Sequence, residues 1–132
     1  MKNPQKESGQ ALVEMALVLP ILLLLLFGII EMTMIGFTYI TIQNAVSAGA
    51  NMAVIGGNDD QVRQAVIDAS PGLTASLLDA GTKIEPPTPT DIQLPPHDVT
   101  ITVTYPVNLI FSVIPGLPNP LNVVATLTEG VP

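Results

Sequence analysis

The stretch KESGQALVEMALVLPILLLLLFGIIE, residues 6–31, decides the fold because it holds an apolar run unusual for a small soluble domain. Residues 15–30 contain no charged side chain, and Glu14 and Glu31 flank them. As a helix this run would be about 24 Å long, slightly less than a hydrocarbon layer of about 30 Å, whereas residues 11–42 would reach about 48 Å. We therefore expect one helix that crosses a membrane and projects beyond it.

Composition limits the alternatives. The 132-residue chain suffices for about one domain and contains no cysteine, so we expect neither a disulfide framework nor a thiolate metal site. Only 11% of its residues are charged, well below the roughly 25% of a soluble domain. The net charge of −7 with no basic cluster argues against a nucleic acid as partner.

The distribution of charge predicts the orientation in the membrane. Lys2 and Lys6 precede the apolar run, whereas only Arg63 and Lys83 follow it, against eight acidic residues from Asp59 onward. A basic flank is the cytoplasmic one under the positive-inside rule. We therefore expect the N-terminus inside the cytoplasmic membrane and the C-terminal portion outside it.

Composition also divides the chain into three parts, which together predict an α+β fold. We expect a leader peptide over residues 1–9, a long hydrophobic helix over residues 10–56, and a small extracytoplasmic module over residues 57–132. The Gly56-Gly57 pair predicts the end of the helix, because glycine adopts the left-handed conformation without strain. The module should combine short helices with an antiparallel sheet of two or three strands.

Two short amphipathic helices are expected after the glycine pair. Asn58 is a good N-cap, and Asp59 and Asp60 favour the first turn of a helix whose apolar face holds Val62, Val66 and Ala69. A second helix should start at Ser70-Pro71, where serine caps and proline fits the first turn, and should end at Gly81. Its apolar side comprises Leu73, Leu77 and Leu78.

The remaining residues predict strands joined by proline-rich segments. Residues 85–97 form a linker rich in proline, after which residues 99–105 alternate apolar side chains with threonine, as in a half-buried strand. Residues 122–129 predict a second strand and residues 82–85 a short third. Residues 106–120 between the long strands form an apolar loop, which either docks on other subunits or folds back over the sheet. Its candidate docking patch is Leu109, Ile110, Phe111, Val113 and Ile114.

A short motif before the apolar run indicates processing. A basic leader ends at Gly9, and Glu14 is the fifth residue after it, where the apolar helix begins. This arrangement resembles the site at which a prepilin peptidase cuts type IV pilins. The resemblance implies a cut between Gly9 and Gln10.

The wider string GQALVEMALVLPILLLLLFGIIE resembles the opening of the TadE-like family, pilin-like proteins of tight-adherence (Tad) pilus systems. The resemblance also covers the small residues at 44–53 and, more loosely, the strand VTITVTYPV. It implies a structural subunit of an adhesive cell-surface filament, whose partners are the membrane, the peptidase, and further copies or other pilin-like subunits. Two alternatives stay open: an anchored pilus-assembly factor that never enters the filament, and a secreted binding module whose ordinary signal peptide is cut at Ala48-Gly49-Ala50.

Glu14 has a physical role independent of the resemblance. A carboxylate inside a membrane costs about 2.5–3.5 kcal/mol and normally persists because it finds a partner. Cleavage would supply one, since the new amine of Gln10 is largely protonated at neutral pH. A pair with Glu14 of a neighbouring chain would fix the register of assembly, whereas a carboxylate lying among the head groups would not.

The far end of the long helix is rich in small residues that let another backbone approach closely. That backbone belongs either to a neighbouring helix in a filament or to the protein's own sheet. The residues concerned are Ala45, Ala48, Gly49, Ala50 and Ala53.

No residue pattern predicts catalysis. The one histidine, His97, falls in the proline-rich linker and predicts a solvated loop residue, and capping explains Asp59 and Asp60. We therefore expect no enzyme activity, no cofactor, no metal site and no small-molecule substrate.

Overall fold

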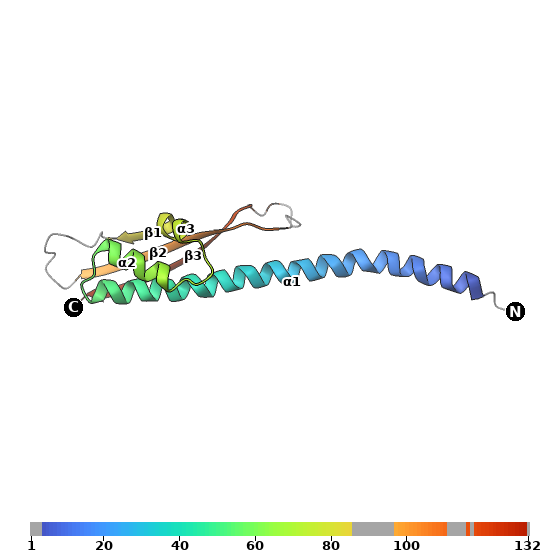
Figure 1. The fold of residues 1–132 in the computed structure, drawn as a ribbon, viewed down its shortest axis with the longest axis horizontal. Helices are drawn as coiled ribbons and strands as arrows, with labels where there is room; N and C mark the ends of the chain where they lie inside the picture. Colours follow the sequence, from blue (N-terminus) through green and yellow to red (C-terminus); the bar gives the residue numbers. More distant parts are fainter. Residues whose placement is uncertain (1–3, 86–96, 111–115, 117, 132) are drawn as a thin grey trace. The chain divides into compact units, whose positions relative to one another are not determined.

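The computed structural model describes residues 4–85, 97–110, 116 and 118–131, with residues 4–8, 97 and 131 described by their backbone alone. Figure 1 shows the order of the elements, which confirms the predicted α+β fold with a long N-terminal apolar helix. The chain divides into two units, Met1–Met34 and Ile35–Pro132. The elements are α1 (Pro4–Val54), α2 (Asp59–Asp68), α3 (Ala75–Gly81), β1 (Thr82–Glu85), β2 (His97–Val107) and β3 (Leu121–Val131).

The first helix contributes to both units and ends where the glycine pair predicts. It starts at Pro4, so the described part of the expected leader is helical, and it continues through Pro20. At its end Gly56 has a φ of 89° and donates to Ala53 O at 3.0 Å, while Gly57 donates to Met52 O at 2.9 Å. These two bonds satisfy carbonyls that the end of a helix leaves unpaired.

The sheet has the order β1-β2-β3 and is antiparallel throughout. Alternation along β2 separates its faces: Ile101 and Val103 are buried, while Thr100 and Thr102 bond to the hydroxyls of Thr128 and Thr126 at 2.8 and 3.1 Å. This confirms the half-buried strand. The sequence places His97 in a loop, however, whereas the structure makes it the first residue of β2, because β3 extends far enough for Val131 to pair with it.

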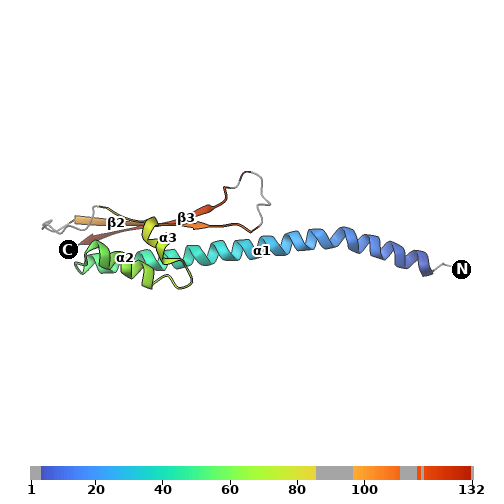
Figure 2. The same ribbon diagram turned by 45° about the horizontal axis from the view of Figure 1, so that its top comes forward.

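The core of the second unit lies between the sheet and the three helices. Figure 2 shows the distal part of α1, α2 and α3 on one side of the sheet, the side that the apolar residues of β2 face. Burial of large side chains contributes about 1.5–3 kcal/mol each, so this layer accounts for most of the module's stability. Its fully buried large side chains are Ile42, Val46, Val62, Val66, Leu78, Ile101 and Val103.

Asn58 caps α2 as predicted, and Gln61 completes a capping box that was not predicted, whereas the start of α3 differs from the prediction. Asn58 Oδ1 accepts from Gln61 N at 2.9 Å, and Gln61 Oε1 accepts from Asn58 N at 3.0 Å. Ser70, the predicted cap of the next helix, instead donates its hydroxyl to Val66 O at 2.7 Å, and α3 begins only at Ala75.

A turn replaces the expected first turn of this helix because Gly72 takes a φ of 83°, which an α-helix does not allow. The shift also changes which leucine is buried. Leu78 is buried and Leu73 packs against the core, whereas Leu77, expected on the same apolar side, is exposed.

Candidate membrane and assembly site

The part of α1 within the unit Met1–Met34 presents an apolar surface that this unit does not cover. Every leucine, isoleucine, valine and methionine from Leu12 to Met34 is exposed. By length and composition α1 is able to cross a membrane, and the candidate span runs over Gly9–Val54. A helix that is apolar on all sides requires either lipid or other helices around it.

Glu14 interrupts this surface one turn after Gln10. Gln10 Nε2 donates to Glu14 Oε1 at 3.2 Å, a contact between residues four apart on an exposed helix face. The structure therefore brings together the two residues that the processing motif singles out. Within one chain, the partner of the Glu14 carboxylate is the amide of the residue that cleavage would make N-terminal.

Gly9 has no structural requirement within its own unit. A Cβ atom built on Gly9 meets nothing within 4 Å, and its φ is not positive. Neither a close approach nor a turn thus explains the glycine. Gly28 and Gly36 on the same helix are equally open, so what distinguishes Gly9 is its place five residues before Glu14.

The small residues at the far end of α1 lie in the chain's own core. Ala45, Ala50 and Ala53 are buried, and a Cβ on Gly49 would come within 2.8 Å of Val66 Cγ2. Ala48, which precedes Gly49 in the sequence, is half-buried. These residues therefore permit a close approach of α2 and the sheet to α1, while packing between helices of different chains stays a prediction.

The predicted docking patch is described in part. Phe111, Val113 and Ile114 lie outside the described residues. Leu109 is half-buried and exchanges two backbone hydrogen bonds with the Asn119 side chain, at 3.1 and 3.2 Å, whereas the side chain of Ile110 is 62% exposed.

Sequence reasoning missed a second group of exposed side chains, on α1 just inside the unit Ile35–Pro132. Phe37, Tyr39 and Ile40 are 55%, 48% and 62% exposed. The signal that could have found them is an aromatic pair close to the end of a membrane-length apolar run, the usual place of interfacial aromatic residues.

Metal-binding geometry is not found among the described residues, where no three histidine or carboxylate side chains gather closely enough to hold an ion. His97 starts β2, and Asp59 and Asp60 lie in the first turn of α2. The arrangement offers surfaces for packing and for one polar pairing in an apolar setting.

These features define a class of protein in which one membrane-length helix leads into a small α+β module. A family model described as TadE-like protein matches residues 9–51, which confirms the resemblance over the segment that contains Gly9, Gln10, Glu14 and most of the candidate span. The comparisons with curated proteins and with solved structures gave no match.

Proposed function

We propose that the chain is a pilin-like structural subunit of a bacterial Tad or type IV-type surface filament. In this proposal a prepilin peptidase removes residues 1–9, the module lies outside the cytoplasmic membrane, and α1 then assembles with the helices of other subunits. The observation that carries the proposal is the TadE-like match over residues 9–51, where Gly9 and Glu14 open an exposed apolar helix.

The two environments of α1 follow from its surface. Lipid covers the exposed apolar side chains while the subunit waits in the membrane, and neighbouring helices cover them in the filament, so transfer between the two changes little in apolar burial. Apolar contacts alone would let helices slide. The carboxylate of Glu14 supplies a polar contact that is able to fix one register.

A structural role is also what the TadE-like match favours over catalysis. In the proposed role the protein packs against lipid and other subunits, and its partners carry out processing and assembly.

Of the two alternatives, the ordinary signal peptide is disfavoured by the core. A cut at Ala48-Gly49-Ala50 would remove Ile42, Ala45 and Val46, all with no exposed surface, from the packing of the module. An anchored assembly factor that does not enter the filament shares every feature of α1 with a subunit, so only localisation separates the two.

Mass spectrometry of the protein from native cells, in the membrane fraction and in sheared filaments, tests both steps of the proposal. We expect a chain that starts at Gln10 in both fractions. Gly9→Val should leave the uncut chain in the membrane, whereas the control Gly36→Val, at a glycine equally open in the structure, should be cut normally. An intact N-terminus in assembled filaments would contradict the processing step, and absence from sheared filaments would favour the assembly factor.

A further inference from the structure

One end of the module carries exposed apolar side chains from two elements far apart in sequence. Phe37, Tyr39 and Ile40 lie on α1, and Ile110 follows the end of β2. We refer to these four residues as the proximal end. All four residues belong to the same unit, Ile35–Pro132, within which their relative positions are defined.

Contacts along the unit place the end of β2 at about the level of Phe37 along α1. At one point Gly49 of α1 lies against Ile101, with a built Cβ 3.4 Å from Ile101 Cδ1. Further along, the turn that contains Gly72 reaches Phe37, and Thr74 N of this turn donates to Tyr105 Oη at 3.1 Å. β2 therefore runs antiparallel to α1.

The rise per residue gives the same alignment. From Ile101 to Val107, the last residue of β2, the strand advances about 20 Å. The same distance along a helix takes about 13 residues, which leads from Gly49 back to about residue 36. Ile110, just after the strand, thus leaves the sheet at the level of Phe37.

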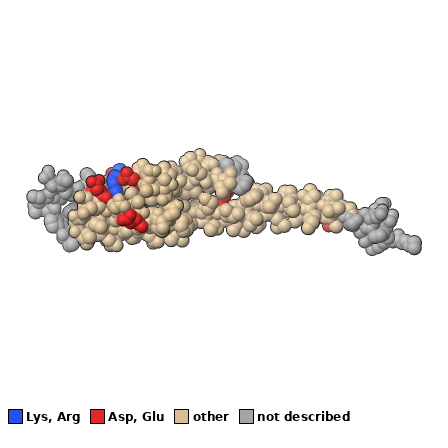
Figure 3. Space-filling view, viewed as in Figure 1, with Lys and Arg blue, Asp and Glu red and all other residues tan. Residues whose placement is uncertain are grey.

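Charge is separated along the module. Residues 32–58 and 99–128 contain no charged side chain. The sheet register places Lys83 and Glu85 opposite Thr102 and Thr100, and Asp98 and Glu129 near the start of β2, away from Ile110. Figure 3 shows charged side chains gathered at that opposite end of the module on the face in view.

The depth of the proximal end follows from the length of the span. A hydrocarbon layer of about 30 Å takes about 20 residues, roughly residues 13–32 when it is centred on the uncharged run 15–30, and the head-group layer of about 5–7 Å takes about four more. Phe37 and Tyr39 then fall at the outer interface, where aromatic side chains are enriched.

We infer that the proximal end docks on the outer surface of the membrane that α1 crosses, with Ile110 inserted among the lipid head groups as a second contact beside the helix. This rests on the membrane crossing of the proposed function. Lipid fits better than a protein partner because Phe37 and Tyr39, two residues apart, point to nearly opposite sides of α1, about 160° apart. A lipid layer surrounds a helix, whereas one partner subunit covers one side.

The experiment uses the absence of cysteine in the sequence. The full chain with Ile110→Cys, Tyr39→Cys, Leu19→Cys or Ile55→Cys is labelled with an environment-sensitive fluorophore. Each variant is reconstituted at low density in vesicles of phosphatidylethanolamine and phosphatidylglycerol, with iodide on both sides as aqueous quencher and head-group nitroxide lipids as interfacial quencher. Ile55 is the matched control, a 77% exposed isoleucine just after the other end of α1.

We expect nitroxide lipids to quench the labels at residues 110 and 39, with iodide quenching several-fold weaker than at residue 55. A label at residue 19 in lipid with the label at residue 110 in water would overturn the inference and leave the membrane crossing intact. A water-exposed label at residue 19 would overturn both. Shielding of the label at residue 110 from both quenchers would mean that it contacts protein, which would also overturn the inference. If dilution with lipid removes the shielding, the contact is with a second copy of the chain.

Discussion

Gly81, the last residue of α3, lies directly against the backbone carbonyl of Thr104 in β2. A Cβ atom at residue 81 would overlap the carbonyl oxygen, and the φ of Gly81 is not positive. Close approach, and not a left-handed conformation, is therefore what requires glycine here. The contact holds α3 against the sheet where Thr82 Oγ1 donates to Leu78 O at 2.7 Å.

Replacing Gly81 by alanine should lower the free energy of unfolding of the module by about 1–3 kcal/mol, because the backbone of Thr104 cannot move aside as a side chain would. Hydrogen exchange of β2 amides, in the full chain in detergent micelles, measures this change. Gly130→Ala is the control, since its Cβ would meet Asp98 Oδ1 at an ordinary 3.5 Å, and it should change stability by less than about 0.5 kcal/mol. Equal effects of the two variants would contradict the steric argument.

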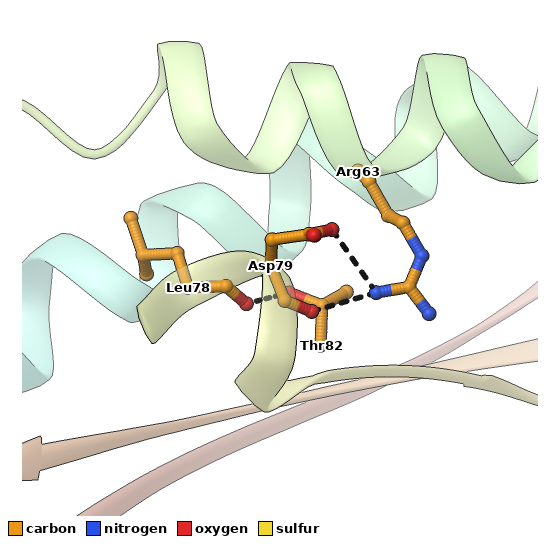
Figure 4. Close-up of polar contacts among 4 residues, drawn as sticks. All are labelled: Arg63, Leu78, Asp79 and Thr82. Atoms are coloured by element: carbon orange, nitrogen blue, oxygen red, sulfur yellow. Dashed lines mark hydrogen bonds and ion pairs between the residues drawn. The ribbon is translucent and has the colours of Figure 1, made fainter. Parts of the chain in front are cut away.

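Arg63 joins α2 to α3 mainly through a backbone carbonyl. Its Nη1 donates to Asp79 O at 2.7 Å and lies 3.4 Å from Asp79 Oδ1, as Figure 4 shows. We expect Arg63→Ala to destabilise the module by about 1.5–3 kcal/mol, the usual range for a hydrogen bond to a charged donor. The same exchange measurement checks it.

The carboxylate of Asp79 should matter much less than its carbonyl. Its side chain is 57% exposed, and exposed ion pairs contribute about 0–1 kcal/mol. Asp79→Asn keeps the carbonyl bond, so we expect a change below about 0.5 kcal/mol and little dependence on salt. A loss as large as that of Arg63→Ala would show that the ion pair, and not the carbonyl bond, joins the helices.

Local chemistry predicted those elements whose cause lies within a few residues. The cap at Asn58, the stop at Gly56 and the alternation along residues 99–105 each depend on neighbours in sequence, and the structure confirms them. The prediction that Ser70 caps the next helix was wrong. A serine hydroxyl can bond either to an amide at the start of the following helix or to a carbonyl of the preceding one, and Ser70 donates to the carbonyl of Val66.

Other features depend on contacts between distant residues and could not be predicted. Gly81 was expected to end a helix through its own conformation, yet its reason is Thr104 on another element. Likewise, the small residues of α1 suit any close neighbour, and only the fold shows that Gly49 meets Val66. For the site, composition predicted an exposed apolar helix, while the aromatic side chains at its end became apparent only from their exposure.

The orientation of the chain gives a further prediction. Because Lys2 and Lys6 lie before the apolar run, we expect the module outside the cytoplasmic membrane. Protease added to intact spheroplasts should then digest the chain after Gly57, whereas a cytoplasmic marker protein survives. Protection of the module until lysis would reverse the topology.

Insertion into the membrane should not require Glu14. Replacing Glu14 by alanine removes a carboxylate that costs about 2.5–3.5 kcal/mol at the centre of a bilayer and less near its edge. We therefore expect Glu14→Ala to reach at least normal abundance in the membrane fraction, measured by quantitative blotting. Reduced abundance would indicate that Glu14 acts before assembly.

Assembly, in contrast, should depend on Glu14. If the amine of Gln10 pairs with Glu14 of a neighbouring subunit, Glu14→Ala leaves a buried charge unpaired, at a cost of about 3–5 kcal/mol. This corresponds to a loss of more than about 100-fold in the association constant, so recovered filaments should nearly vanish. Glu14→Asp keeps the charge with a shorter reach and should assemble in part, while Glu14→Gln should resemble alanine.

Gln10→Ala is the decisive control, because it removes the side-chain bond seen in the structure and prevents cyclisation of the N-terminus, yet keeps the amine. Once mass spectrometry shows that it is cut, normal filaments from Gln10→Ala would identify the amine as the partner, whereas normal filaments from Glu14→Ala would eliminate the pairing mechanism.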